Sequence, residues 1–151
     1  MTYITLYSNN GAIPALKLAP IDIFATLYGA LCHDYEHDGF NNPYHVNSQS
    51  IRFKTHGEAG VQEKYHFAES YRMIEQFNLL GPLAPEKKQL FKKRMQSCVL
   101  ATDMARHMDD LKRVQAAVEE NEGKDSDKKS YDTQMVLDLA VHASDVSFHG
   151  R

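Results

Sequence analysis

The sequence predicts an all-α fold, an irregular bundle of several helices. Apolar residues recur at spacings of three and four in several separate segments, and no segment alternates apolar and polar residues as a half-buried strand does. Glycine- and proline-containing turns separate those segments. The chain has 151 residues, of which 42% are hydrophobic and 25% charged. These values are typical of one globular domain with a single core.

The first predicted helix follows an irregular lead-in over residues 1–19, which shows no sustained period. Pro20 stands where proline is tolerated, in the first helical turn, and Asp22 lies at the positive end of the helix dipole. The helical spacing then continues to about residue 32, where His33 and Asp34 follow. Its apolar stripe comprises Ile21, Phe24, Ala25, Tyr28, Leu31 and Cys32.

Three further helices are predicted downstream. After dense turn signals at 38–43, a second helix spans about 58–77 and ends before Gly81-Pro82. A third begins at Pro85 and continues, with a bend, to about Val118. Residues 119–130 contain no apolar side chain and are expected to form a mobile surface loop. The last helix runs from about Thr133 toward Asp145.

Composition excludes several classes of function. The formal net charge is −3 with both signs mixed, so there is no basic stripe for nucleic acid. The longest apolar run, 21–32, is too short to span a membrane. The first residues lack a secretory signal, which predicts a cytoplasmic location. Cys32 and Cys98 lie in apolar helical settings and are expected to be reduced, buried thiols.

The strongest chemical signal is a run of ionisable side chains that directly follows the first helix. Imidazole and carboxylate groups suit zinc, magnesium, manganese or iron, and a carboxylate can bridge two ions. Asp145 follows another apolar helix, so two helix ends can bring His33, Asp34 and Asp145 together as a metal site. The alternative is a solvated helix end whose histidines sit near the negative dipole. Five ionisable side chains fall within seven residues here: His33, Asp34, Glu36, His37 and Asp38.

Four ordered blocks resemble one family. Residues 30–42 match the pattern His-Asp-x-x-His-x-Gly-x-x-Asn, and residues 63–66 resemble a Glu-Asn-x-His block. Residues 100–107 contain a Thr-Asp-Met block and residues 141–147 a His-x-x-Asp-x-Ser block. This set resembles the catalytic domain of class I 3′,5′-cyclic nucleotide phosphodiesterases, members of the HD superfamily. The resemblance implies a single partial domain over 1–151, truncated at both ends, with part of that family's helical bundle.

The resemblance also implies roles for matching residues. His33 and Asp145 would be zinc ligands, and Asp34 would bridge zinc and a second ion, magnesium or manganese. The family hydrolyses cyclic AMP or cyclic GMP to the 5′-monophosphate at this two-metal site, so a cyclic nucleotide is the implied ligand. Residues implied to support the centre are His37, Asn42, Glu63, His66, Thr102 and Asp103.

Parts of the family pattern are missing. No histidine precedes His33, so the family's acid histidine and first zinc ligand have no counterpart, and no catalytic residue is assigned. The chain ends at Arg151, before the family's purine-selecting glutamine. Losing the acid costs roughly 10²–10⁴-fold in rate, so this chain alone is expected to be weak or inactive. Smaller departures from the family pattern occur at three places where the family has other residues: His56-Gly57-Glu58, Lys64 and Phe148-His149.

Three interpretations remain open. The chain is a fragment of a cyclic nucleotide phosphodiesterase, a degenerate relative that serves as a structural or binding subunit with protein partner chains, or an HD hydrolase of another phosphate ester. The second interpretation predicts exposed apolar faces that a partner would cover. Taken singly, each candidate for such a face is more simply explained as core; the candidates are Phe67, Tyr71, Met95, Met104 and Met108.

Overall fold

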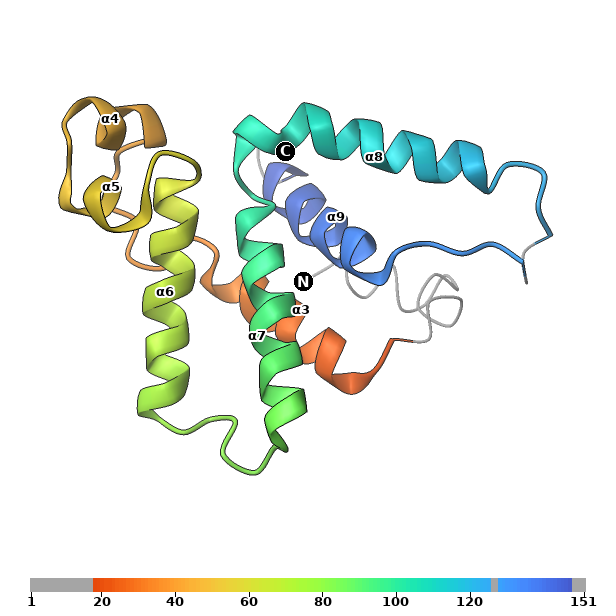
Figure 1. Cartoon of the computed structure of the whole chain (residues 1–151), viewed down its shortest axis with the longest axis horizontal. Helices are drawn as coiled ribbons and strands as arrows, with labels where there is room; N and C mark the ends of the chain where they lie inside the picture. Colours follow the sequence, from red (N-terminus) through yellow and green to blue (C-terminus); the bar gives the residue numbers. More distant parts are fainter. Residues whose placement is uncertain (1–17, 126–127, 148–151) are drawn as a thin grey trace.

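The computed structural model describes residues 18–125 and 128–147, and within these ranges it contains helices and no strand. The all-α prediction is confirmed (Figure 1). No helix in the described part is long and apolar enough to cross a membrane. The elements are α3 (Pro20–Cys32), α4 (Asn42–Asn47), α5 (Ile51–His56), α6 (Val61–Gln76), α7 (Pro85–Leu100), the 3-10 turn η1 (Met104–Arg106), α8 (His107–Glu120) and α9 (Thr133–Val146).

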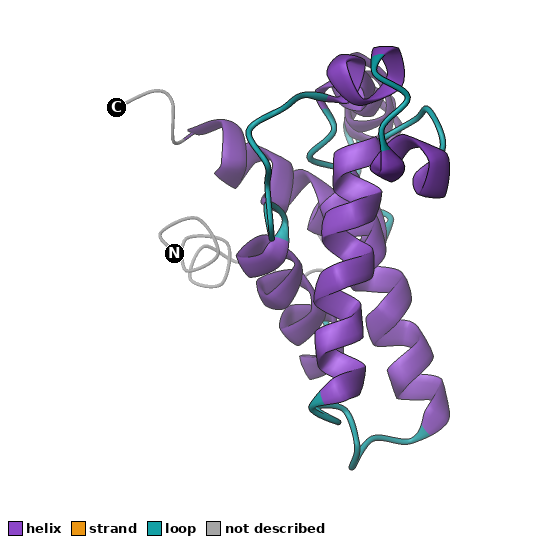
Figure 2. Cartoon of the chain, turned by 90° about the vertical axis from the view of Figure 1, so that its left-hand side faces the viewer, coloured by secondary structure: helices purple, strands orange, loops and turns teal. Residues whose placement is uncertain are grey.

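Helix α7 forms the centre of the bundle and contacts α3, α6 and α9 (Figure 1). Its stripe of Phe91, Met95 and Val99 is completely buried. Figure 2 shows α6 and α7 side by side above their connecting loop. At the crossing with α3, a Cβ on Gly29 would lie 3.3 Å from the Cβ of Cys98. A glycine at this position therefore lets the two helices approach closely.

A polar chain locks α3, α7 and α9 to one another. The Arg94 Nε donates to Asp22 Oδ1 at 2.8 Å, and Arg94 Nη1 donates to Gln134 Oε1 at 2.9 Å. Asp132 is the N-cap residue of helix α9, and its side chain accepts a hydrogen bond from the Met135 backbone N–H at 2.7 Å. Since these contacts fix where α9 starts and which face it turns to α3, they also place Asp145 near the end of α3.

Two short helices, α4 and α5, lie between the turn signals at 38–43 and the second predicted helix, where the sequence analysis assigned no helix. Each is six residues long and begins at a side-chain cap. Asn41 accepts from Tyr44 N–H, and Ser50 accepts from Phe53 N–H. Caps of this kind satisfy the first free N–H groups of a helix. The apolar spacing used to find the other helices is absent from such short segments, which explains why they were missed.

The predicted third helix is divided. Helix α7 ends at Leu100, and Asp103 caps η1 by accepting from Ala105 N–H at 3.0 Å. Helix α8 then extends through Glu120, so the polar stretch 119–130 is not entirely loop. Within it, Asn121 is buried, and its side chain accepts from Ser130 N–H at 2.9 Å. The lead-in over 1–17 and residues 148–151 lie outside the described residues.

The candidates for an exposed apolar face divide into core residues and exposed residues. Phe67 and Met95 are buried because α6 and α7 turn these residues into the core. Tyr71 is half-buried against the same cluster. Met104 and Met108 are exposed, at 60% and 62%. Both cysteines are free and buried, as predicted.

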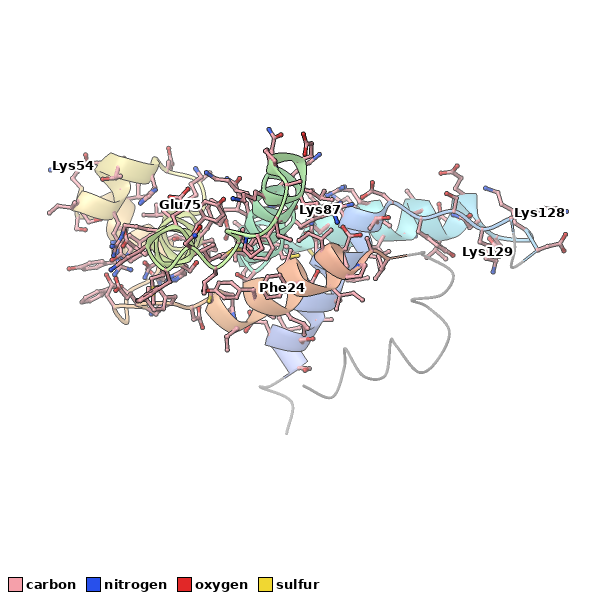
Figure 3. The ribbon with its side chains drawn as sticks, turned by 90° about the horizontal axis from the view of Figure 1, so that it is seen from below. Phe24, Lys54, Glu75, Lys87, Lys128 and Lys129 are labelled. Atoms are coloured by element: carbon pink, nitrogen blue, oxygen red, sulfur yellow. The ribbon has the colours of Figure 1, made fainter. Side chains whose placement is uncertain are left out.

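Helix α8 extends away from the bundle and contains no buried residue. Figure 3 shows Lys128 and Lys129 near the far end of this extension, at the opposite extreme of the molecule from Lys54. Phe24 lies on α3, where its ring centroid is 5.1 Å from that of Phe91. The bundle and α8 therefore differ sharply in how much of their surface is packed.

Candidate metal centre

The ends of α3 and α9 bring His33, Asp34 and Asp145 together, as the sequence analysis expected. His33 Nε2 lies 3.2 Å from Asp145 Oδ1 and 3.4 Å from Asp34 Oδ2. On the other side of the ring, His33 Nδ1 lies 2.8 Å from the carbonyl oxygen of Ala30, so Nδ1–H donates to it. The hydrogen bond to Asp145 is the main reason that the pKa of His33 rises to about 9. A cation bound there would replace the proton on Nε2.

His66 supplies a second imidazole to the same region. It is 1% exposed, and its Nδ1 lies 2.6 Å from the carbonyl oxygen of Tyr35. Since a carbonyl oxygen only accepts, Nδ1 carries the proton and Nε2 keeps a lone pair. Nε2 is buried and has no hydrogen-bond partner, and burial lowers the pKa of His66. A neutral imidazole held through its other nitrogen is the usual form of a metal-binding histidine.

Asp34 lies close to both His33 and His66. One carboxylate oxygen of Asp34 and one ring nitrogen each of His37 and His66 all lie within 4.8 Å of one another. Buried orphan acceptors such as His66 Nε2 are rare in folded proteins. A divalent cation next to Asp34 would satisfy that nitrogen with a borderline donor set that suits zinc. The residues present therefore fit a metal ion.

His37 is in the opposite tautomer from His66. The Gly39 N–H donates to His37 Nδ1 at 2.9 Å, so the neutral ring carries its proton on Nε2. Its ring is stacked on that of His66, with centroids 5.5 Å apart. In this form His37 offers an N–H donor to a water or an anion beside the centre. The supporting role expected for His37 stays a prediction.

The other expected supporting residues line one groove with Asp34, His37 and His66. The Asn42 Nδ2 donates to Glu63 Oε2 at 2.9 Å, and burial is the main reason that the pKa of Glu63 is raised. Thr102 and Asp103, which directly follow α7, also line the groove, and Asp103 is 8% exposed. The groove has a volume of about 900 Å³. His33 and Asp145 lie outside its lining and reach it through Asp34.

Sequence reasoning missed the residues that hold the loop around His37. Arg52 and Gln62 contact several atoms of residues 36–40. Arg52 lies on α5, which was not predicted, and Gln62 lies near the start of α6; the pattern of polar residues alone gave no sign of their contacts. Two of the residues that depart from the family pattern contact each other: Lys64 Nζ donates to the carbonyl oxygen of His56 at 3.0 Å. Lys64 and Glu58 both line the groove.

Fold and site together define a helical protein with a candidate divalent-metal centre in a groove. The family model described as 3′5′-cyclic nucleotide phosphodiesterase matches residues 1–151. The chain belongs to the 3′,5′-cyclic nucleotide phosphodiesterase family.

Curated relatives agree with this family. The probable 3′,5′-cyclic phosphodiesterase pde-1 of Caenorhabditis elegans is 33% identical over 135 residues, which cover 88% of this chain and 19% of that protein. The dual specificity calcium/calmodulin-dependent 3′,5′-cyclic nucleotide phosphodiesterase 1 of Drosophila melanogaster is 33% identical over 132 residues, 86% of this chain and 15% of that protein. This chain thus spans less than a fifth of either relative.

Solved structures show the same fold. The phosphodiesterase domain of Salpingoeca rosetta rhodopsin phosphodiesterase superposes with a TM-score of 0.74 at 23% identity, over 83% of this chain and 39% of that one. The phosphodiesterase domain of the RhoPDE fusion protein from the same choanoflagellate gives 0.76 at 21% identity, over 89% and 44%. The expected relationship to part of that helical bundle is confirmed, because this chain matches less than half of each solved domain.

Proposed function

We propose that this chain carries part of the two-metal centre of a cyclic nucleotide phosphodiesterase, and that by itself it hydrolyses cyclic AMP or cyclic GMP weakly or not at all. The observation that carries the proposal is the buried, unpartnered Nε2 of His66 beside the Asp34 carboxylate. Zinc suits the imidazole and carboxylate donors, and magnesium or manganese suits a second position bridged by Asp34. The family membership supports the choice of substrate.

Each residue has a definite task in this proposal. His33, Asp34, His66 and Asp145 would hold the cations, and the His37 Nε2–H would donate to a phosphoryl oxygen of the substrate. When bound, two divalent ions activate water at neutral pH and neutralise charge on the phosphoryl oxygens. No residue is assigned to protonate the leaving 3′ oxygen, and this is the reason for the low expected rate. A missing general acid lowers the rate roughly 10²–10⁴-fold.

Zinc titration of the purified chain tests the metal centre. We compare the wild type with Asp34→Asn and His66→Gln, and use His56→Gln as the matched control because His56 lies outside the donor group. Both site variants are expected to raise the Kd for Zn²⁺ by more than the roughly 10- to 100-fold that the loss of an outer partner costs, since each removes a ligand itself. The control should bind as the wild type does. Equal affinity in all four proteins would contradict the proposal.

Hydrolysis assays test the activity. Cyclic AMP and cyclic GMP are incubated with the chain, Zn²⁺ and Mg²⁺, alongside a His33→Ala, Asp34→Ala double variant. We expect the wild type to be slower than a complete phosphodiesterase domain by at least about 100-fold, given the missing acid. Full-rate turnover that the double variant abolishes would show that the chain needs no further residues.

The alternative is a non-catalytic subunit of a larger assembly, and it draws on helix α8. Met108 and Leu111 are 62% and 44% exposed on a helix with no buried residue. Apolar faces of this kind often mark protein contacts. Under this alternative, Met108→Lys and Leu111→Lys lower the mass of the assembled chain in light scattering while the helix content is unchanged. A wild-type chain that is monomeric at every concentration would count against assembly through its own copies.

A further inference from the structure

The two residues on either side of His37 are held by one arginine. Arg52, on α5, donates from Nη2 to the carbonyl oxygen of Glu36 at 2.9 Å. Its Nε lies 3.5 Å from Asp38 Oδ2. The guanidinium group therefore spans the loop directly beside His37, from the residue before it to the residue after it. Arg52 reaches this loop from 16 positions along the chain from Glu36.

Arg52 is itself fixed by the helix that carries His66. Its guanidinium carbon lies 3.7 Å from the centroid of the Tyr65 ring, and its Nη1 donates to Gln62 Oε1. The side chain is 15% exposed, so it is fixed from several sides. A planar guanidinium can stack on a ring and donate in several directions at once, which an ammonium group cannot do. The contacts tie the His37 loop to α6, one residue from His66.

Further hydrogen bonds close this arrangement. Tyr65 Oη donates to Glu36 Oε2 at 2.7 Å. Gln62 Nε2 donates to Asp38 Oδ1 at 2.8 Å and to the carbonyl oxygen of Phe40 at 2.7 Å, and Gln62 is 3% exposed. These five residues, Glu36, Asp38, Arg52, Gln62 and Tyr65, are here called the Arg52 network.

The backbone conformation shows that the loop needs this support. Glu36 has a φ of 57°, in the left-handed region that residues other than glycine enter at a cost of about 1 kcal/mol or more. Such a conformation persists where surrounding contacts hold it. At Glu36, both the backbone carbonyl and the carboxylate are held by the network. The next residue is His37, whose ring stacks on His66 with an interplanar angle of 23°.

We propose that Arg52 is a positioning residue for the candidate metal centre: by gripping Glu36 and Asp38 it fixes the ring and the tautomer of His37 beside His66. The proposal rests on the proposed function, because the centre it positions is the one described there. Losing Arg52 frees the left-handed turn at Glu36, and the Gly39 N–H contact that selects the His37 tautomer is then no longer held in place. The groove keeps its residues but loses the orientation of this donor.

The test compares Arg52→Met with the wild type, with Arg52→Lys and with Arg72→Met. Arg72 is the matched control because it lies on α6, is 60% exposed and pairs with Glu69 alone among the ion pairs of the described residues. Three quantities are measured: the free energy of unfolding in urea, the nitrogen–proton correlations of the histidine rings in the metal-free chain, and the Kd for Zn²⁺. His37→Gln assigns the signals of the His37 ring.

We expect Arg52→Met to be folded, as a cooperative unfolding transition in urea would show. In the folded variant, the His37 signals should move from those of a single Nε2–H tautomer toward an average of both tautomers. The Kd for Zn²⁺ should rise about 10- to 100-fold, the usual effect of losing an outer contact of a metal site. Arg52→Lys should not restore the His37 signals or the Kd for Zn²⁺, since lysine cannot form the forked contacts. Arg72→Met should match the wild type in both. A folded Arg52→Met whose His37 signals and Zn²⁺ affinity equal those of the wild type would overturn the proposal.

Two further outcomes are separated by the same data. If Arg52→Met fails to fold, Tyr65→Phe takes its place, because it removes only the hydroxyl group that binds Glu36. It should shift the His37 signals in the same direction by a smaller amount, and unchanged signals would overturn the proposal. If the wild type binds no Zn²⁺, the proposed function fails, while the tautomer of His37 in the metal-free chain still decides the role of Arg52.

Discussion

Two regions of this molecule are held in different ways, one chiefly by apolar packing and the other by polar contacts. The framework, α3, α6, α7 and α9, is held by apolar packing around α7, where Phe91, Met95 and Val99 are completely buried. The segment 33–60, which carries His37 and Asn42, buries one residue of α4 and none of α5. Hydrogen bonds from Arg52 and Gln62 hold it instead. Packing around α7, together with the Arg94 contacts to α3 and α9, thus decides where the helix ends meet, and the polar contacts of the segment 33–60 decide how its side chains are turned.

Substitution in the framework should have the largest effect. Phe91→Ala removes a completely buried ring that packs against Phe24 and Tyr28. The free energy of unfolding should fall by about 3–5 kcal/mol. Urea denaturation measures it, and Phe77→Ala is the control because Phe77 is 62% exposed. A loss below about 1 kcal/mol for Phe91→Ala would show that packing around α7 is not what holds the framework.

The junction between the two regions should respond to pH. The pKa of His33 is raised from 6.5 to about 9, chiefly by the hydrogen bond to Asp145. A raised folded pKa stabilises the fold fully below the unfolded value of about 6.5, and this contribution is lost as pH rises through about 9. In metal-free protein, His33→Gln should therefore cost about 1–3 kcal/mol in the free energy of unfolding near pH 6, and much less above pH 9.

Urea denaturation of both proteins between pH 6 and 10 measures this difference. His56→Gln is the control, since burial lowers the pKa of His56 while the pKa of His33 is raised. A destabilisation by His33→Gln that stays constant up to pH 10 would mean that the contact with Asp145 is not an ion pair.

A smaller effect is expected at the start of α9. Asp132→Ala removes the side-chain oxygen that accepts from Met135 N–H. The loss of an N-cap lowers stability by about 1 kcal/mol. Thermal denaturation should show it, with Asp125→Ala unchanged because Asp125 is exposed and pairs only locally with Lys128. If Asp132→Ala leaves stability unchanged, α9 is held by its contacts with α7 and α3 and not by its cap.

The same division explains what the sequence could predict. The framework helices were found because apolar residues such as Phe91 and Met95 recur with the helical period, and packing follows that period. The meeting of His33, Asp34 and Asp145 followed from two helix ends. Helices α4 and α5 were missed because caps at Asn41 and Ser50 form them without an apolar stripe.

The part of the site that the sequence did not predict is the polar part. His66 was expected to support the centre, and its free Nε2 emerges only once Nδ1 is seen to face Tyr35. Arg52 makes contacts with Glu36 and Gln62 that depend on the direction of one long side chain. Such contacts have no repeating spacing, so local sequence patterns do not reveal them.

The most direct test of the central claim is the crystal structure of the chain soaked with Zn²⁺, with the ion located by its anomalous scattering. We expect an ion bound to the Asp34 carboxylate at about 2.0–2.2 Å and to His33 or His66 through Nε2 at about 2.0–2.1 Å. Crystals with Zn²⁺ elsewhere on the molecule, and with the Nε2 of His66 still lacking a partner, would contradict it.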